Sequence, residues 1–240
     1  MSSHLQSYPL TRRHFGVRNT VIACAFVLVL AVAAGLLFVR KAGQPLTSEA
    51  FYGELMTSPK AAYDFHLSDQ DGKPFRLGQL RGKVVLFTFG YTHCPDVCPS
   101  TLSDLAQIYR SLPEDDRARV QILFISVDPR RDQPDLLKKY MPYFDPAFIG
   151  LTGSADEIDE TVAAYGAAYT LVRPQGKTSD VYYVNHSSFT YLVSPDGKWE
   201  LRYLYTQLKN TKEVVADIEK CLAGIARPAT ASRRSRSAVL

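Results

Sequence analysis

The sequence predicts an α/β domain built on a parallel core sheet, with an N-terminal β-hairpin and a single transmembrane helix ahead of it. Three observations support this class. Short apolar runs alternate with segments of helical periodicity, which is typical of parallel strands joined by helices. Two alternating segments flank an Asp-Gly pair near the start of the domain. Residues 20–39 form an uncharged stretch of 20 residues.

The uncharged stretch is interpreted as a membrane anchor. As a helix it would be about 30 Å long, the thickness of the hydrocarbon core of a bilayer. Arginines in residues 1–19 indicate that this segment is cytoplasmic, so residues 41–240 are expected on the periplasmic side of the inner membrane. A cleaved signal peptide, or a twin-arginine export signal at residues 11–15, is the alternative. Each alternative places the domain on the same side.

The first half of the domain shows four segments. Residues 40–60 have no clear pattern and are interpreted as a linker with at most one short helix. Residues 63–77 alternate on both sides of an Asp-Gly turn and predict a hairpin. Residues 83–91 are an apolar run, as expected for a strand covered on both faces. Residues 101–112 place their apolar side chains on one helical face.

The second half continues the alternation. Residues 120–128 predict another buried strand, and residues 133–141 a short helix with a proline near its start. Residues 148–153 predict a third strand of the core. A helix is then expected to begin after Ser154, which is a favourable N-cap before an acidic first turn, and to run to about residue 169. Residues 188–205 predict two antiparallel strands joined by a turn.

The predicted domain spans residues 61–225. In residues 211–225 the apolar side chains recur on one helical face that includes Cys221, so this cysteine is interpreted as a core residue. Residues 226–240 contain arginines and no acid, and they predict a disordered basic tail.

The charge of the chain argues against a nucleic-acid-binding protein. The chain has 28 Lys and Arg against 24 Asp and Glu, a formal net charge of +4. Nine of the basic residues lie in residues 1–41 and 225–240, which contain no acid. The part between is therefore mildly acidic, and it has no basic stripe with interleaved aromatic residues.

Cys94 and Cys98 are the candidate reactive residues. They follow a buried strand and precede a helix, which is where ligands and reactive groups lie in open α/β sheets. Pro95 and Pro99 are expected to stiffen the loop and delay the helix. A nearby helix N-terminus favours the thiolate, which is the form that exchanges disulfides and binds metals. The pair is therefore interpreted as a redox pair or as part of a metal site, since proline and aspartate neighbours do not suit a core face.

Three histidines are candidates to complete a metal site with the two sulfurs. His66 lies on a strand of the predicted hairpin and is interpreted as a surface residue. His93 adjoins Cys94, and chelation by adjacent side chains is usually strained. His186 precedes the last buried strands, and it meets the cysteines only if the strand order brings its loop to the same edge of the sheet.

Three segments together resemble the Sco/SenC family of copper metallochaperones, which act in cytochrome c oxidase assembly. They are FGYTHCPDVCPSTLSDL at residues 89–105, ISVDPRRDQP at residues 125–134, and VNHSSFTYLVSPDG at residues 184–197. The resemblance covers about residues 65–222. It implies a thioredoxin-like fold, which agrees with the element order above, and an N-terminal membrane anchor.

The resemblance also implies a function. Carried over by residue, it makes Cys94, Cys98 and His186 the ligands of one copper ion per domain, held as Cu(I) or Cu(II). It implies delivery of copper to the dinuclear copper A centre of cytochrome c oxidase by a carrier rather than an enzyme. The expected partners are the oxidase subunit with that centre and an upstream copper chaperone. Asn185 departs from the aspartate that many members carry beside the histidine, which changes a neighbour of the ligand but not the ligand set.

Several alternatives stay open at this point. A thiol-disulfide oxidoreductase would use Cys94 and Cys98 as a redox-active disulfide that keeps a client's copper-ligand cysteines reduced. Against it, three residues instead of two separate the cysteines, and residues 186–188 stand where thioredoxins carry a cis-proline. A zinc protein with the same ligands and a tethered interaction domain without metal are further alternatives. Asp128 and Asp132 are interpreted as turn residues and not as a catalytic carboxylate pair.

Overall fold

The computed structural model describes residues 51–173 and 182–224. The predicted cytoplasmic segment 1–19, the anchor 20–39 and the basic tail 226–240 lie outside these residues. Within the described ranges, no helix has both the length and the apolar character needed to cross a membrane.

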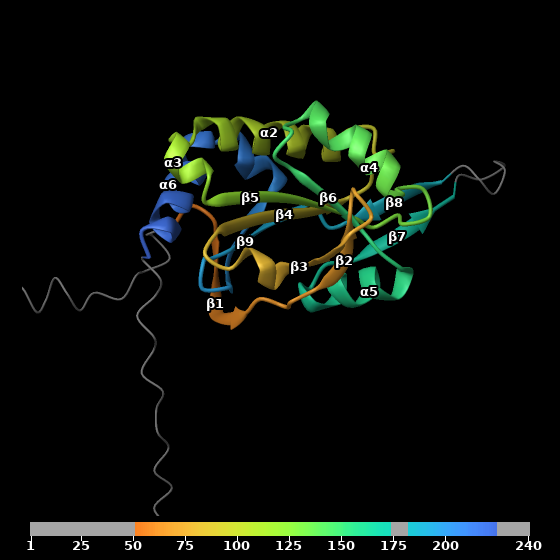
Figure 1. Ribbon diagram of the computed structural model, residues 1–240, viewed down its shortest axis with the longest axis horizontal. Coiled ribbons are helices and arrows are strands. Elements are labelled where there is room, and N and C mark those ends of the chain that lie inside the picture. The colour runs from red at the N-terminus through yellow and green to blue at the C-terminus, as the bar shows by residue number, and fades with distance from the viewer. Residues whose placement is uncertain (1–50, 174–181, 225–240) are drawn as a thin grey trace, which may run out of the picture. The chain divides into compact units, whose positions relative to one another are not determined.

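A mixed sheet of eight strands forms the centre of the domain. Its strands are β1 (Glu54–Ala61), β2 (His66–Asp69), β3 (Pro74–Arg76), β4 (Val84–Gly90), β5 (Val120–Ser126), β6 (Ile149–Thr152), β9 (Phe189–Val193) and β10 (Lys198–Leu204). Their order in the sheet is β1-β10-β9-β4-β5-β6-β2-β3 (Figure 1). Strands β4, β5 and β6 are mutually parallel, and β9 pairs antiparallel with β4. The predicted parallel core and the late antiparallel pair are both confirmed.

Helices cover both faces of this sheet. They are α2 (Val97–Ser111), α3 (Glu114–Arg117), α4 (Pro134–Tyr140), α5 (Ala155–Ala164) and α6 (Thr211–Leu222), with short 3-10 helices η2 (Leu77–Leu80), η3 (Met141–Tyr143) and η4 (Tyr205–Lys209). Helices α2, α4 and α6 lie on one side of the sheet, and α5 lies on the other (Figure 1). Every residue of β4 is buried between these layers, which explains its continuous apolar sequence.

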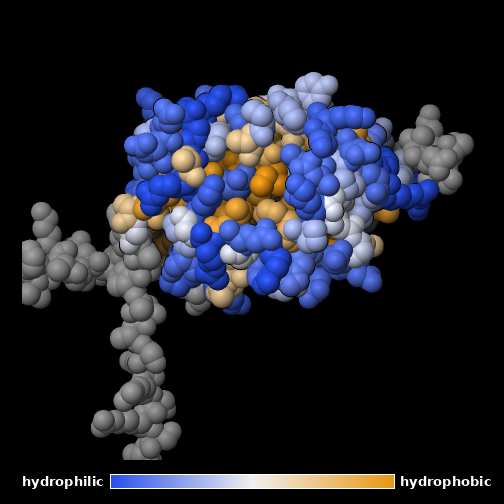
Figure 2. All heavy atoms as spheres, in the orientation of Figure 1, coloured by the Kyte–Doolittle hydropathy of each residue, from blue (hydrophilic) through white to orange (hydrophobic). Residues whose placement is uncertain are grey.

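Buried apolar residues form a core cluster, and one face of the domain also exposes apolar residues. Apolar residues gather in the middle of the face shown in Figure 2, and hydrophilic residues surround them. Inside, Phe87 of β4 stacks on Tyr191 of β9 with 5.0 Å between ring centroids, and Tyr165 meets the Phe87 ring edge-on at 4.7 Å. Cys221 is buried on α6, which confirms its interpretation as a core residue.

The N-terminus of α5 confirms the predicted cap. The Ser154 hydroxyl accepts a hydrogen bond from the Glu157 amide, and the Glu157 carboxylate accepts one from the Ser154 amide at 2.7 Å. This capping box satisfies two backbone donors that the helix leaves free. The helix ends earlier than predicted, at Ala164, because Gly166 adopts a positive φ of 63° and turns the chain.

Three strands were not anticipated from the sequence pattern. The linker prediction covers residues 40–60, whereas Glu54–Ala61 form β1, an edge strand paired with β10 through an irregular register. An edge strand with a register break has no strict alternation of apolar and polar residues. The other two are β7 (Tyr169–Val172) and β8 (Tyr183–His186), which pair with each other in a two-stranded ribbon separate from the central sheet.

Asp217 fastens the start of the described chain to the last helix. Its carboxylate is fully buried, and it accepts hydrogen bonds from the amides of Tyr52 at 3.0 Å and Gly53 at 2.9 Å. The Tyr203 hydroxyl and the Lys220 ammonium donate to the same group, each at 3.1 Å. A buried carboxylate is tolerated only with such partners, so this cluster fixes where the chain enters β1.

Replacing Asp217 by alanine should therefore lower the free energy of unfolding by about 3 kcal/mol, because it leaves several buried donors without an acceptor. The measurement is urea unfolding of the purified protein, followed by circular dichroism. Glu219→Ala is the matched control, since Glu219 is an exposed carboxylate on the same helix and its loss should change stability by at most about 0.5 kcal/mol. Equal effects of the two variants would contradict the prediction.

Candidate metal centre

The cysteine segment joins the C-terminal end of β4 to α2. The amide of Cys94 donates to the Tyr91 carbonyl at 3.2 Å, which closes a tight turn after the strand. The helix begins at Val97, so Cys98 lies in its first turn and is buried. The prediction that the prolines delay the helix is wrong for Pro99, which is the third residue of α2. A proline in the first turn lacks only an amide that has no partner within the helix.

Gly90 leaves room for the sulfur of Cys98. A Cβ atom at Gly90 would lie 2.8 Å from Cys98 Sγ and 2.6 Å from a ring carbon of Phe124. Real carbon atoms do not approach this closely, so a side chain at the end of β4 would displace the sulfur. Gly90 lies within the motif that carries the family resemblance, but it was not among the predicted site residues.

His186 is the last residue of β8, and the strand order brings it to the cysteines. Because β9 is antiparallel to β4, with Thr190 opposite Thr88, the segment before β9 lies beside the C-terminal end of β4. His186 Nε2 is 3.3 Å from Cys98 Sγ. His186 Nδ1 is 3.0 Å from the Ser187 carbonyl oxygen, which can only accept. Nδ1 therefore carries the proton, and Nε2 offers its lone pair to the sulfurs.

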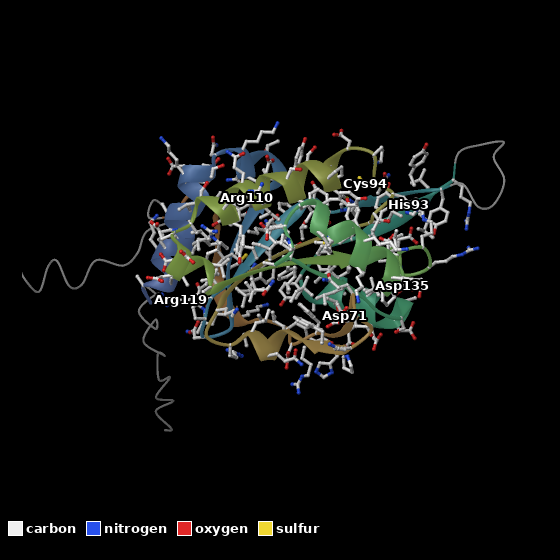
Figure 3. All side chains as sticks on the ribbon, turned by 45° about the horizontal axis from the view of Figure 1, so that its top comes forward. Asp71, His93, Cys94, Arg110, Arg119 and Asp135 are labelled. Carbon is white, nitrogen blue, oxygen red and sulfur yellow. The ribbon has the colours of Figure 1, made fainter. Side chains whose placement is uncertain are left out.

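The three side chains form one cluster of potential metal ligands. Their ligand atoms lie within 4.8 Å of one another, and no other group of three His, Cys, Asp or Glu side chains in the described part of the chain meets this criterion. Figure 3 places Cys94 at the end of the domain from which the two-stranded β7–β8 ribbon extends. The cluster opens into a cleft lined by Tyr91, Cys94, Pro95, Asp96, Val97, Tyr183, Val184, Asn185, His186 and Ser188.

The two thiols have opposite electrostatic environments. A hydrogen bond from the Cys98 thiol lowers the pKa of Cys94 to about 3, and the amides of Asp96 and Cys98 act in the same direction against the effect of partial burial. The hydrogen bond to Cys94 and deep burial raise the pKa of Cys98. Without metal, the pair therefore holds one thiolate, at the half-exposed Cys94, and one protonated thiol.

The other candidate histidines lie elsewhere. His66 is exposed on β2. His93 turns away from the sulfurs, with Nδ1 3.0 Å from the Thr92 hydroxyl and 3.7 Å from an oxygen of Asp132. Neither belongs to the cluster of ligand atoms.

Asp132 supports the cysteine segment from the neighbouring strand. It lies in the turn after β5, as predicted, but its fully buried carboxylate also accepts three hydrogen bonds. The donors are the Thr92 amide at 2.9 Å, the Thr92 hydroxyl at 2.6 Å and the Ser126 hydroxyl at 2.6 Å. Asp132 thus ties the turn before Cys94 to the end of β5. Sequence reasoning missed this role, because spacing does not show which partners a turn carboxylate finds.

The chemistry of the cluster suits a soft or borderline metal ion. Two sulfurs and one imidazole, with one side open, fit Cu(I) or Cu(II), and they also fit zinc. The same two sulfurs can instead form a disulfide.

Comparison with known proteins gives consistent matches. The family model described as SCO1/SenC matches residues 53–223. The SCO2-like protein RC0895 of Rickettsia conorii is 35% identical over 79% of this chain and 92% of its own length. The mitochondrial protein SCO2 of Saccharomyces cerevisiae is 42% identical over 56% of this chain, and the match spans only 44% of the yeast protein.

Solved structures of similar proteins share the fold. Apo Sco1 from Thermus thermophilus is 40% identical with a TM-score of 0.64, covering 70% of this chain and 95% of its own. Bradyrhizobium japonicum ScoI with copper bound is 33% identical with a TM-score of 0.59, covering 67% and 99%. BsSco, described as having a disulfide switch and as a member of the Sco family of cytochrome c oxidase assembly proteins, is 26% identical with a TM-score of 0.53, covering 70% and 98%.

Cys94 should react with iodoacetamide at pH 5, because a thiol with its pKa near 3 is already deprotonated there. Cys98 and Cys221, whose pKa values are raised, should not react at this pH. Peptide mapping by mass spectrometry after timed alkylation measures each site in the metal-free, reduced protein.

Cys98→Ala is the informative control for this measurement. It removes the thiol that donates to Cys94, so the pKa of Cys94 should rise and its alkylation at pH 5 should slow by about tenfold or more. An unchanged rate in this variant would show that the Cys98 hydrogen bond is not what stabilises the thiolate.

Proposed function

The chain belongs to the SCO1/SenC family, and from this premise we propose that it binds one copper ion through Cys94, Cys98 and His186. The observation that carries the proposal is that two sulfurs and an imidazole nitrogen with a free lone pair, His186 Nε2, lie within 4.8 Å of one another. The copper-bound Bradyrhizobium relative supports copper over zinc, since the donor set alone suits both metals.

Each ligand has a distinct task in this proposal. Two thiolates suffice for Cu(I), which accepts low coordination by soft ligands. Cu(II) also requires nitrogen, and His186 Nε2 is the nitrogen at hand. The ion replaces the proton of Cys98, so the two sulfurs can both be thiolates despite their proximity and burial.

We further propose that the protein delivers this copper to the dinuclear copper A centre of cytochrome c oxidase. The open cleft supports this role, because Cys94 is half-exposed and a partner's ligand can approach the ion from that side. An upstream copper chaperone would load the site through the same opening.

Residues 20–39 would anchor the protein in the inner membrane with the domain in the periplasm. A reporter that is active only in the periplasm, fused after Leu240, should therefore be active, and an inactive reporter would refute this topology.

A second candidate function uses the same sulfurs without metal. A thiolate at Cys94 beside a protonated thiol at Cys98 is the state that attacks a disulfide. Cys94 would form a mixed disulfide with a client cysteine, and Cys98 would release the reduced client as Cys94 and Cys98 became a disulfide. The two electrons of the dithiol pass to the client's copper-ligand cysteines. The disulfide switch attributed to BsSco supports this alternative.

His186→Ala should weaken Cu(II) binding far more than Cu(I) binding, because two thiolates still satisfy Cu(I). Competition titrations with chelators specific for each oxidation state provide the two affinities, and the thiolate-to-Cu(II) charge-transfer band should change in position or intensity. His93→Ala is the matched control, since His93 is adjacent to Cys94 in the sequence but its side chain faces Asp132. Normal Cu(II) affinity in His186→Ala would refute the proposed ligand set.

The two candidate functions separate in cells. If copper delivery is the function, His186→Ala should reduce assembly of the copper-containing oxidase, and added copper should partly restore it. The same variant should reduce a small disulfide at a nearly normal rate, because that reaction needs only the two cysteines. Oxidase activity and copper content of purified membranes are the measurements. Normal assembly in His186→Ala, together with failed assembly in Cys94→Ala, would favour the reductase.

A further inference from the structure

The ribbon that carries His186 is not held by the central sheet. In the pairing of the described strands, β7 and β8 bond to each other and to no strand of the eight-stranded sheet. At the base of the ribbon, the Ser187 amide donates to the Ala168 carbonyl at 2.9 Å, and the Ala168 amide donates to the Ser187 hydroxyl at 3.0 Å. These bonds close the ribbon on itself. Apart from the short covalent links to α5 and β9 at its base, the position of the ribbon on the domain depends on side-chain contacts.

Arg131 and Asp128 make such contacts at the entry of β8. Arg131 lies in the turn after β5, and its guanidinium donates to the Asp128 carboxylate and, at 3.0 Å, to the Tyr182 carbonyl. The guanidinium also lies over the Tyr182 ring, 3.7 Å from its centroid. Asp128 accepts a hydrogen bond from the Tyr182 hydroxyl at 2.7 Å. The backbone, ring and hydroxyl of Tyr182 are thus all bound by this ion pair.

The contacts continue from Arg131 to the metal centre. The guanidinium lies 5.6 Å from the centroid of the Tyr91 ring. Tyr91 in turn meets His186 edge-on, with ring centroids 6.0 Å apart and an interplanar angle of 88°. Its carbonyl accepts the hydrogen bond from Cys94. Arg131 therefore lies between the ribbon entry and the residue that touches both the imidazole and the cysteine turn.

The alternation of β8 explains how a contact at its entry can aim its last residue. Tyr182 and Val184 are buried, whereas Tyr183 and Asn185 are exposed. Side chains two residues apart in a strand point to the same face. His186 therefore faces the domain in register with Tyr182, and a fixed Tyr182 directs the imidazole toward the sulfurs.

We propose that Arg131, paired with Asp128, is a positioning residue that docks the β7–β8 ribbon and thereby holds His186 Nε2 at the sulfurs. The inference rests on the proposed copper function and specifies what sets the preference between the two oxidation states. The two cysteines lie in the segment from the end of β4 to the first turn of α2, whereas His186 lies on the β7–β8 ribbon. Loosening the ribbon removes nitrogen from the site and leaves the sulfurs in place.

The test compares Arg131→Met with Arg131→Lys in the full-length protein. Arg131→Met keeps the bulk of the aliphatic part of the side chain. It should lower Cu(II) affinity about tenfold or more, which is the usual effect of losing a residue that orients a metal ligand, while Cu(I) affinity stays unchanged. Nitrogen hyperfine coupling in the Cu(II) electron paramagnetic resonance spectrum should weaken. Arg131→Lys should recover only part of the affinity, because an ammonium cannot both bridge to the carboxylate and stack on the tyrosine as a guanidinium does.

Arg110→Met is the matched control. Arg110 likewise donates to a backbone carbonyl, that of Phe144, at 3.0 Å, and lies 3.6 Å from a carboxylate, that of Asp145. It lies toward the other end of α2 from Cys94 (Figure 3). Its loss should leave both copper affinities unchanged.

Loss of Cu(II) binding through unfolding must be distinguished from loss through misplacement of His186. Arg131→Met leaves Asp128 buried without its cation, so the double variant Asp128→Asn with Arg131→Met, which removes both charges, is measured in parallel. Thermal unfolding establishes that each variant is folded before metal is added. The folded double variant should show the same selective loss of Cu(II) affinity as Arg131→Met.

Combination with His186→Ala separates the two proposals. In that background, Arg131→Met should cause no further loss of Cu(II) affinity, because the group it positions is already absent. If His186→Ala is selective for Cu(II) but the folded Arg131 variants bind Cu(II) normally, or lose Cu(I) equally, the positioning role is overturned and the ligand set stands. If His186→Ala itself has no effect, the ligand set fails.

Discussion

The antiparallel pairing of β9 with β4 is the contact on which the candidate metal centre depends. β4 delivers the cysteines at its C-terminal end, and β9 receives the chain from His186 at its N-terminal end. Only opposite strand directions bring these two ends to one edge of the sheet. Phe87 and Tyr191 lie opposite each other in this pair and stack at 5.0 Å, so the centre of the core secures the register that the site requires. A slip by one residue would turn these side chains to the other face.

Buried carboxylates fasten the segments that the sheet does not hold. Asp132 binds the cysteine turn, Asp128 with Arg131 binds the ribbon, and Asp217 binds the chain that leads into β1. Burying a charge costs several kcal/mol, and well-placed partners offset this cost without a large surplus. These carboxylates therefore fix geometry more than they add stability, because a carboxylate bonded to several donors allows the segments that carry those donors few relative positions. All three join segments distant in sequence, and two of them converge on the metal centre.

The metal-free thiol pair connects the two candidate functions. Cys98 keeps its proton because it is buried and because that proton is shared with Cys94. A metal ion can take the place of the proton. Alternatively, an oxidant can accept two electrons as the sulfurs join in a disulfide and the proton is released. Copper binding and disulfide exchange therefore compete for one state of the same two atoms. Only the histidine, which arrives on a separate element, distinguishes the metal site from a simple dithiol.

Local periodicity and chain direction were enough to predict the buried strands, the parallel core, the Ser154 cap and the position of Cys94 and Cys98 between a strand and a helix. The sequence also limited the candidates for a third metal ligand to three histidines, among which the family resemblance favoured His186. Only the tertiary structure showed that His186 reaches the sulfurs, that Gly90 makes room for one of them, and that β1 and the β7–β8 ribbon exist. These features depend on which strands become neighbours. Strand order is set by packing of the whole core, and no local pattern encodes it.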